Sequence, residues 1–284
     1  MKVLVTGAGG YIGRHVVDSL LKCKDTEVIA ADIFTDGINP AADRRSVNIF
    51  DRSEDIFEKL GSPDVCIHLA WKDGFVHNSE AHMGMLSDHF IFINNMIKGG
   101  LKQLSVMGTM HEIGYFEGAI DENTPCNPTS MYGIAKDALR KAVLQLGKST
   151  GCTVNWLRAY YIYGDDIKSN SIFAKLTAAE QEGKELFPFT MGKNKYDFIH
   201  VDELAEQITA ASCQNEITGI INVCTGIPVS LADKVEGYIK EHGFKIKLQY
   251  GAFPDRPYDS PGVWGNADKI KRIMEKRSKG NNFK

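Results

Sequence analysis

The chain opens with a short apolar run that ends in a dense group of glycines, and this arrangement constrains the fold more than any other feature. After the initial methionine, the letters KVLVT have the composition of a buried strand, and GAGGYIG leads directly into a helical stretch. Gly7 permits a tight turn, Gly10 lets the backbone approach a pyrophosphate, and Gly13 allows the helix to pack closely on the strand. A helix N-terminus also offers amide donors to phosphates. The sequence therefore predicts a dinucleotide-binding turn, with Tyr11 and Ile12 beside the ligand.

Apolar runs alternate with helical stretches along the first half of the chain. This alternation predicts an α/β fold with a doubly wound parallel sheet, because buried parallel strands read as unbroken apolar runs and right-handed crossovers place helices on both faces. The alternation weakens after Gly164, so we expect a Rossmann domain over residues 1–164 and mostly a smaller substrate lobe over residues 165–284, with some elements returning to the large sheet. The expected strands lie at residues 2–6, 27–32, 46–49, 64–70, 103–107, 153–159 and 219–224.

The composition excludes several classes of protein. Of the 284 residues, 43% are hydrophobic, which suffices for a core without disulfides, and 33 basic against 36 acidic residues give no reason to expect nucleic acid or a membrane surface as a partner. The basic C-terminal stretch from residue 269 indicates a solvated helix and tail. No segment has the length of a membrane helix or the form of a signal peptide, and the six cysteines show no C-x-x-C pair. We expect a cytoplasmic protein with reduced thiols.

A metal site is not expected. The dipeptide His111-Glu112 begins like the helix of a zinc protease, but Tyr115 stands where the second histidine would be required.

An acidic residue at the end of the second expected strand indicates which dinucleotide binds. Asp32 lies 19 residues after Gly13, where a carboxylate can bind both hydroxyls of the adenine ribose and repel a 2′-phosphate. This favours NAD(H), although an ordinary strand-end aspartate in a turn is the alternative. Arg44 and Arg45 follow closely, so NADP(H) stays open as the cofactor.

A tyrosine and a lysine four residues apart supply candidate acid/base chemistry. Tyr132 and Lys136 lie on one face of an expected helix. A free tyrosine has a pKa of about 10, and a neighbouring ammonium would lower it by stabilising the phenolate. The pair could then exchange a proton with a hydroxyl beside a hydride-bearing carbon. A simple pair on a helix surface is the alternative, but the fifth strand ends at Thr109, and ligands of open α/β sheets bind at strand carboxyl ends.

Over most of its length the sequence resembles the extended short-chain dehydrogenases/reductases, specifically the nucleotide-sugar epimerase/dehydratase/reductase group. The segments that carry the resemblance are the G-x-x-G-x-x-G of Gly7, Gly10 and Gly13; the polar–apolar pair Asn48-Ile49; His68-Leu69-Ala70-Trp71, which is similar to H-L-A-A; Thr109, five residues before Gly114; Tyr132 with Lys136; Leu157-Arg158 and Tyr163-Gly164; the D-F-I segment from Asp197 to Leu204; and Arg256, Asp259, Pro261 and Trp264.

The resemblance implies roles for individual residues. Tyr132 would be the general acid/base, Lys136 would lower its pKa and bind the nicotinamide ribose, and Thr109 would hydrogen-bond the reacting oxygen. Arg256 would hold the diphosphate of a nucleotide sugar, with a loop salt bridge as the alternative. Further cofactor contacts are implied for Asn48, Ile49, Leu69, Ala70, Trp71 and Tyr160.

Departures from the family pattern narrow the activity. Dehydratases usually carry Asp-Glu after the catalytic threonine, and Met110-His111 stand there instead, which disfavours elimination of water. His111 could face the substrate or lie on the surface. Tyr161 replaces a common asparagine and is also assigned to the substrate side, and Tyr196 replaces the arginine that usually precedes D-F-I.

The function expected from these features is reduction of a 4-keto (deoxy)sugar on a nucleotide, with NAD(H) favoured. A 4-epimerase that retains NAD is the alternative, because it would use the same threonine, tyrosine and lysine. A non-catalytic NAD(P)-binding scaffold is the third hypothesis, although such relatives usually lose the tyrosine or the lysine. Helices near residues 80–98 and 132–148 resemble the family's dimer-forming pair, so we expect a homodimer.

Overall fold

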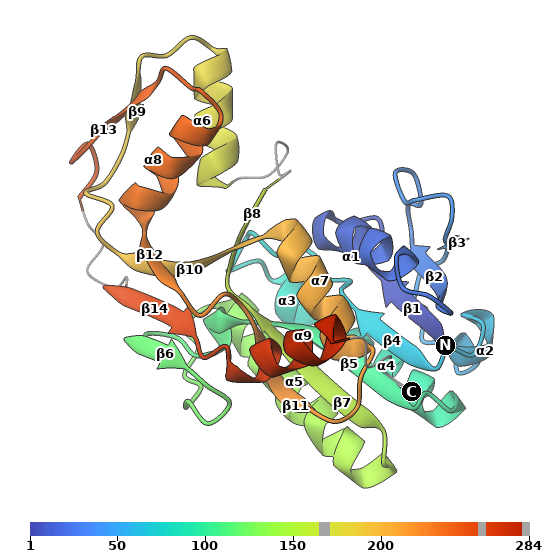
Figure 1. Cartoon of the computed structure of the whole chain (residues 1–284). Helices are drawn as coiled ribbons and strands as arrows, with labels where there is room; N and C mark the ends of the chain where they lie inside the picture. Colours follow the sequence, from blue (N-terminus) through green and yellow to red (C-terminus); the bar gives the residue numbers. More distant parts are fainter. Residues whose placement is uncertain (165–170, 255–259, 280–284) are drawn as a thin grey trace.

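A computed structural model describes residues 1–164, 171–254 and 260–279. Within these residues, Figure 1 shows a large twisted sheet with helices on both faces, and a smaller part beside one end of it. Seven parallel strands form the large sheet in the order β11-β7-β5-β4-β1-β2-β3. Because β1 lies between β2 and β4, the strand order reverses there, and the prediction of a doubly wound α/β fold is confirmed. The strands are β1 (Lys2–Thr6), β2 (Glu27–Asp32), β3 (Asp43–Ser46), β4 (Val65–His68), β5 (Gln103–Thr109), β7 (Thr153–Ala159) and β11 (Gly219–Val223).

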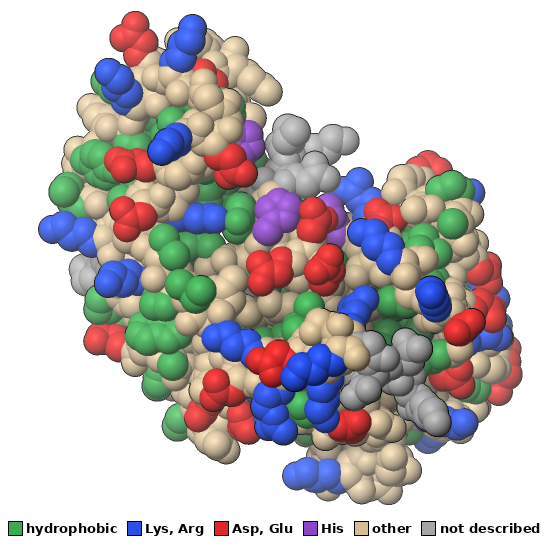
Figure 2. Space-filling model, in the orientation of Figure 1, with side chains coloured by type: hydrophobic (Ala, Val, Ile, Leu, Met, Phe, Trp, Pro, Cys, Tyr) green, Lys and Arg blue, Asp and Glu red, His purple; other side chains and the backbone are tan. Residues whose placement is uncertain are grey.

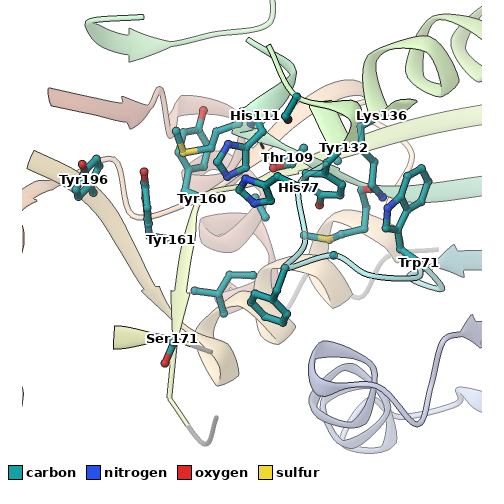
Figure 3. A pocket seen from close by; sticks show the side chains of 18 of the residues that line it. Trp71, His77, Thr109, His111, Tyr132, Lys136, Tyr160, Tyr161, Ser171 and Tyr196 are labelled. Atoms are coloured by element: carbon teal, nitrogen blue, oxygen red, sulfur yellow. Dashed lines mark hydrogen bonds between the residues drawn. The ribbon is translucent and has the colours of Figure 1, made fainter. Parts of the chain in front are cut away.

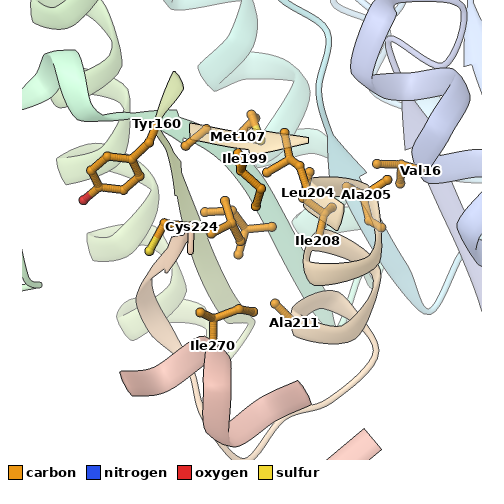
Figure 4. Close-up of a cluster of buried hydrophobic side chains, with 14 of the residues drawn as sticks. Val16, Met107, Tyr160, Ile199, Leu204, Ala205, Ile208, Ala211, Cys224 and Ile270 are labelled. Carbon is orange, nitrogen blue, oxygen red and sulfur yellow. The ribbon is translucent and has the colours of Figure 1, made fainter. Parts of the chain in front are cut away.

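The two faces of this sheet bury two separate hydrophobic clusters, because successive side chains of a strand point to opposite sides. In β1, Val3 and Val5 belong to one cluster and Leu4 belongs to the other. Figure 4 shows part of the first cluster, where side chains of the sheet meet those of the helices on that face. That face carries α1 (Tyr11–Leu21), α7 (Val201–Ser212) and α9 (Asp268–Ser278), and the opposite face carries α2 (Ile56–Lys59), α4 (Leu86–Gly99) and α5 (Met131–Thr150), with α3 (Ala81–Gly84) beside α5.

The smaller part contains a mixed sheet and a pair of helices. Strands β12, β10, β14 and β6 are neighbours in that order, and β8 also pairs with β10. A separate pair, β9 with β13, lies with α6 and α8 at the far end of the molecule (Figure 1). The elements of this part are β6 (Gly118–Ile120), β8 (Tyr161–Tyr163), α6 (Ile172–Gln181), β9 (Leu186–Pro188), β10 (Lys195–His200), β12 (Pro228–Ser230), α8 (Leu231–Glu241), β13 (Lys247–Gln249) and β14 (Gly262–Gly265). The short helix η1 (Met110–Glu112) follows β5 of the large sheet and contacts α5.

The sequence did not indicate β10, and a buried charge explains why. Asp197 lies in the middle of this strand and is fully buried. Its carboxylate accepts hydrogen bonds from the backbone amides of Thr225, Gly226 and Gly265 at 2.9, 2.9 and 3.2 Å. A charged residue interrupts the apolar run that marks a strand, yet here it joins β10 to β14 and to the loop after β11.

A second difference concerns β3, which covers Asp43–Ser46 instead of the expected residues 46–49. Three of the four side chains of this edge strand are exposed, so it has no apolar run. Ile49, which suggested the later position, is buried in a core cluster just beyond the strand.

The basic C-terminal stretch begins as helix α9, as expected. Figure 2 shows lysine and arginine side chains gathered over this helix, whereas Ile270 and Ile273 are buried beneath it. Two of the lysines have acidic neighbours: Lys269 lies 3.1 Å from Glu122, and Lys276 pairs with Glu216.

In the described part of the chain, no helix has the length and apolar character needed to cross a membrane.

The close packing of α1 on the glycine turn gives a testable prediction. A Cβ atom on Gly13 would lie 2.1 Å from the carbonyl oxygen of Gly7, so Gly13→Ala should lower the free energy of unfolding by about 1–3 kcal/mol. Gly84 is the matched control, because a Cβ atom on this helical glycine would meet no atom within 4 Å. Urea denaturation of both variants measures the effect. Equal stability of the two alanine variants would contradict the packing argument.

Candidate active site

The glycine turn leaves the N-terminus of α1 open toward the end of the sheet. Gly7 has φ +70°, and a Cβ atom there would lie 2.5 Å from the backbone nitrogen of Ala70, which follows β4. A Cβ atom on Gly9 would lie 2.5 Å from the carbonyl oxygen of Phe34. The turn is therefore held close to the ends of β2 and β4, and the amides at the start of α1 can meet a phosphate group.

Asp32 lies beside this turn, as expected from its place at the end of β2. One of its carboxylate oxygens accepts a hydrogen bond from the Gly9 amide at 3.0 Å, and the other accepts from the Phe34 amide at 3.3 Å. The side chain is half-buried, so the carboxylate is oriented by the backbone and still reaches the surface. Of the two nearby arginines, Arg45 is bound to Asp43 and to the carbonyl of Lys59, whereas Arg44 is exposed.

Four residues assigned to the cofactor do not line the cavity described below: Asp32, Asn48, Ile49 and Ala70. Asn48 accepts a hydrogen bond from the Phe50 amide at 3.1 Å. Ile49 is buried in the core, and Ala70 packs against Gly7. Their assignment to the cofactor stays a prediction.

A cavity of about 1420 Å³ runs from the glycine turn into the smaller part of the molecule (Figure 3). Single-ligand pockets usually measure about 300–1,000 Å³, so this one has room for a dinucleotide and a second ligand. The predicted residues that line it are Gly7, Gly10, Tyr11, Ile12, Gly13, Leu69, Trp71, Thr109, His111, Tyr132, Lys136, Tyr160 and Tyr161.

Thr109, Tyr132 and Lys136 come together on one wall of this cavity. Thr109 ends β5, and the other two lie in the first turns of α5. Helix α5 begins at a Ser130 cap, whose hydroxyl accepts a hydrogen bond from the Gly133 amide at 3.2 Å. Within the tripeptide Met131-Tyr132-Gly133, the glycine is required, because a Cβ atom there would lie 2.3 Å from the carbonyl oxygen of His111.

The pKa values of Tyr132 and Lys136 differ from the expectation that the neighbouring ammonium lowers the pKa of the tyrosine. Burial raises the pKa of the Tyr132 hydroxyl, and the hydrogen bond with the Thr109 side chain opposes this shift. Burial lowers the pKa of Lys136 to about 7, while the Glu112 carboxylate acts to raise it. Desolvation therefore dominates the shift of the tyrosine pKa, and the Lys136 nitrogen lies 5.9 Å from the centre of the tyrosine ring. Both pKa values are shifted in the way that is common at functional sites.

Glu112 is a residue that the sequence interpretation missed. It is fully buried, and one carboxylate oxygen accepts hydrogen bonds from the Thr109 amide at 2.7 Å and from Trp156 Nε1 at 2.8 Å. The other oxygen lies 3.4 Å from the guanidinium of Arg140 and 3.6 Å from that of Arg158. The sequence signal was the capping box that Thr109 and Glu112 form at η1. Because this carboxylate faces inward and does not line the cavity, it does not replace the missing acid pair of a dehydratase.

His77 was also missed, because it lies in a loop without a motif. Its ring stacks on Tyr132 with a centroid distance of 5.5 Å and lies 4.3 Å from the ring of His111. Burial lowers the pKa of both imidazoles, that of His111 to about 4. Within the described ranges, no hydrogen bond uses a ring nitrogen of either histidine, and both rings line the cavity. Two neutral imidazoles therefore offer donors and acceptors beside Tyr132.

The remaining predicted residues lie farther along the cavity. Tyr161 lies 4.3 Å from Tyr196, ring centre to ring centre, and both line the wall in the smaller part (Figure 3). Tyr160 lines the wall too, but its ring is in the hydrophobic core (Figure 4) and its hydroxyl donates to Asn222 at 3.1 Å. Arg256 lies outside the described residues. Within residues 1–164, 171–254 and 260–279, no three His, Cys, Asp or Glu side chains are grouped so that they could hold a metal ion.

Comparison with known proteins identifies relatives of this chain. The model of the NAD dependent epimerase/dehydratase family matches residues 3–224. The dTDP-6-deoxy-L-talose 4-dehydrogenase (NAD(+)) of Aggregatibacter actinomycetemcomitans is 44% identical over 274 residues, which cover 93% of this chain and 99% of the relative. A putative UDP-glucose 4-epimerase of Methanocaldococcus jannaschii is 28% identical over 87% of this chain and 85% of its own.

Solved structures share the fold at lower identity. A UDP-glucose 4-epimerase of Thermus thermophilus in complex with NAD superposes with a TM-score of 0.81 at 22% identity, covering 96% of this chain and 93% of the other. The corresponding enzyme of Thermotoga maritima with UDP-glucose gives 0.80 at 24% identity, over 96% and 92%. These likenesses show the doubly wound fold, and with the match over residues 3–224 they lead to one conclusion. This chain belongs to the NAD-dependent epimerase/dehydratase family, within the extended short-chain dehydrogenases/reductases.

Proposed function

We propose that this protein is an NAD-dependent oxidoreductase that interconverts the 4-hydroxyl and 4-keto forms of a nucleotide-activated deoxysugar. The observation that carries the proposal is the meeting of Thr109, Tyr132 and Lys136 on the wall of a cavity that starts at the glycine turn. The relative at 44% identity is named for oxidation at C4 of a dTDP-bound 6-deoxysugar with NAD+. Oxidation of the alcohol and reduction of the ketone are the two directions of one reaction.

The chain supplies the proton chemistry and the positioning. In the oxidative direction, Tyr132 takes the proton of the 4-hydroxyl while the Thr109 hydroxyl holds the same oxygen. The Lys136 ammonium favours the phenolate and can also donate to ribose hydroxyls. Bound NAD+ would accept the hydride from C4. In the reductive direction Tyr132 returns the proton to the carbonyl oxygen.

The cofactor assignment rests on the turn and on Asp32. The glycines leave room for a pyrophosphate at the start of α1, and we assign the Asp32 carboxylate, which the Gly9 amide holds beside the turn, to the adenine ribose. The relative at 44% identity is named for NAD+. Arg45 is engaged with Asp43, which leaves it unsuited to a 2′-phosphate.

The substrate side is assigned to residues farther along the cavity. We assign the neutral pair His77 and His111 to sugar hydroxyls next to the reacting carbon, because both side chains line the cavity beside Tyr132. Tyr161 is assigned to the activated sugar as well, and Arg256 stays the predicted ligand of the diphosphate. In this arrangement residues 1–164 bind the dinucleotide and also supply these sugar contacts, whereas the predicted contribution of residues 165–284 is mostly to the sugar nucleotide.

A 4-epimerase is the second candidate, since several relatives and solved neighbours are named as epimerases. An epimerase returns the hydride within the same turnover, so it releases no reduced cofactor. Net formation of NADH therefore separates the two functions.

A homodimer is part of the proposal. Phe90 in α4 and Met131 and Ile134 in α5 are large apolar side chains that are 36%, 42% and 40% exposed. The two helices contact each other and could form a four-helix interface with a second copy. Analytical ultracentrifugation should show a dimer that Phe90→Glu converts to monomer, because a charge there would be buried without a partner. A monomeric parent protein would contradict the proposal.

The activity is tested with NAD+ and dTDP-6-deoxy-L-talose, followed by NADH absorbance. We expect one NADH for each sugar oxidised, and Tyr132→Phe should lower kcat by about 10²–10⁴ because the proton carrier is lost. NADH affinity should change little in this variant. Tyr250→Phe is the matched control, because Tyr250 bonds to Glu236 outside the cavity.

Two outcomes would contradict this scheme. Activity of Tyr132→Phe within threefold of the parent would remove the tyrosine from the mechanism. Conversion of the sugar without NADH formation would favour the epimerase.

The preference for NAD(H) is tested by fluorescence titration with NADH and NADPH. The parent protein should bind NADH more tightly, because the Asp32 carboxylate accepts from ribose hydroxyls and repels a 2′-phosphate. Asp32→Ala should weaken NADH binding about ten- to hundredfold, since a hydrogen bond to a charged group contributes about 1.5–3 kcal/mol. Asp18→Ala, on the outer side of α1, is the control. Equal affinity of the parent for both nucleotides would show that Arg44 or another group outweighs the carboxylate.

A further inference from the structure

Trp71 follows β4 and replaces the second alanine of the H-L-A-A pattern. Its indole lies against the side chains that surround the catalytic lysine. The Lys136 nitrogen lies 3.7 Å from the centre of the indole ring, and the His89 ring stacks on the indole at 4.3 Å with an angle of 21°. The Tyr132 ring meets it edge-on at 6.1 Å. Figure 3 shows Trp71 and Lys136 facing each other at one end of the cavity.

The nitrogen at the edge of the indole is held by a hydrogen bond as well. Trp71 Nε1 donates a hydrogen bond to His82 Nδ1 at 3.0 Å, and His82 Nε2 donates to the carbonyl of Val76 at 2.9 Å. The next residue, His77, accepts a hydrogen bond from the Tyr132 amide through its carbonyl at 2.9 Å and stacks on the tyrosine ring. The indole thus contacts Lys136 directly, and it is linked to Tyr132 through His82 and the adjacent residues Val76 and His77.

We propose that Trp71 is a positioning residue that holds the Lys136 ammonium in place and stabilises its positive charge. The aromatic face of tryptophan attracts a cation more strongly than that of any other side chain, and the attraction grows where water is excluded. This inference rests on the proposed role of Lys136 but assigns Trp71 a task of its own.

The surroundings of Lys136 show why such a contact is needed. The side chain is buried, and its nitrogen donates to the Met107 carbonyl at 2.7 Å. The Glu112 carboxylate of η1 is the attractive charge that acts on it. Of the titratable groups facing it from β4 and α4, His68 and His89 are neutral at physiological pH, because burial lowers their pKa values to about 3 and about 2.

These two histidines also hold each other in the neutral form. His68 Nδ1 shares a hydrogen bond with the Thr6 hydroxyl at 2.7 Å, and its Nε2 with His89 Nδ1 at 2.9 Å. A further titratable group near Lys136 is the Tyr132 hydroxyl on α5, and burial keeps its pKa high. The Met107 carbonyl, the Glu112 carboxylate and one aromatic face therefore oppose the desolvation of the ammonium, and removal of the indole should favour the neutral amine.

The direct test measures the pKa of Lys136 in the protein without nucleotide. The ¹³Cε signal of labelled lysine is followed by NMR against pH and assigned with Lys136→Arg. Compared with the parent, Trp71→Leu should lower the midpoint by about one pH unit, and Trp71→Phe by less, because phenylalanine keeps a weaker aromatic face. Trp264→Leu is the matched control, since Trp264 does not line the cavity. If Trp71→Leu does not fold, the difference between the parent and Trp71→Phe carries the test.

The second readout is the pH profile of kcat/KM with NAD+ and dTDP-6-deoxy-L-talose. Burial places the pKa of Lys136 below that of Tyr132, so the lysine sets the acid limb of the profile and the tyrosine sets the alkaline limb. In Trp71→Leu the lower lysine pKa should move the acid limb to lower pH, and the profile should also become lower because the charged lysine beside the phenolate is less populated. A lower but unshifted profile, with an unchanged Lys136 midpoint, would overturn the proposal. If the parent does not turn over this sugar, the substrate assignment fails while the NMR titration still decides the role of Trp71.

Discussion

The carboxylate of Glu112 joins the segment that carries Thr109 to the large sheet and to α5. It reaches the Thr109 amide on β5, Trp156 on β7 and Arg140 on α5, all inside the protein. A buried charge is tolerated only where hydrogen bonds and opposite charges surround it, and loss of one partner leaves the others unpaired. This group of contacts therefore fixes η1 in one position, and the hydroxyl of Thr109 and the backbone of His111 are placed with it.

Close approach of backbones reinforces this arrangement. Gly108 and Gly133 lie on either side of η1, and Cβ atoms there would lie 2.1 Å from Trp156 Nε1 and 2.3 Å from the His111 carbonyl oxygen. Helix α5 can thus come near enough to β5 for Tyr132 and Thr109 to act on the same oxygen. The glycine after the tyrosine has a steric role in the site, and a motif alone does not reveal it.

The sequence predicted what depends on local pattern. The glycine turn, the order of β1, α1 and β2, and the doubly wound sheet follow from apolar periodicity and turn chemistry, and these predictions are confirmed. It did not predict β10, because the partners of Asp197 lie 28 or more residues away in the chain. Trp71 was expected only as a cofactor contact, because its neighbours Lys136 and His82 come from two different helices. The expectation for Tyr132 omitted desolvation, which no spacing in the sequence reports.

Strand β10 passes into α7 without a loop, since the strand ends at His200 and the helix begins at Val201. The strand belongs to the mixed sheet of the smaller part, whereas the helix packs along α1 on the large sheet, and His15 of α1 lies 2.6 Å from Asp202. Strand β11 likewise returns to the edge of the large sheet. Segments crossed in this way tie the core of the smaller part to the large sheet, so unfolding of the large sheet would also remove the support of the smaller part. The boundary expected at residue 164 would then separate mainly cofactor binding from mainly substrate binding within one cooperative folding unit.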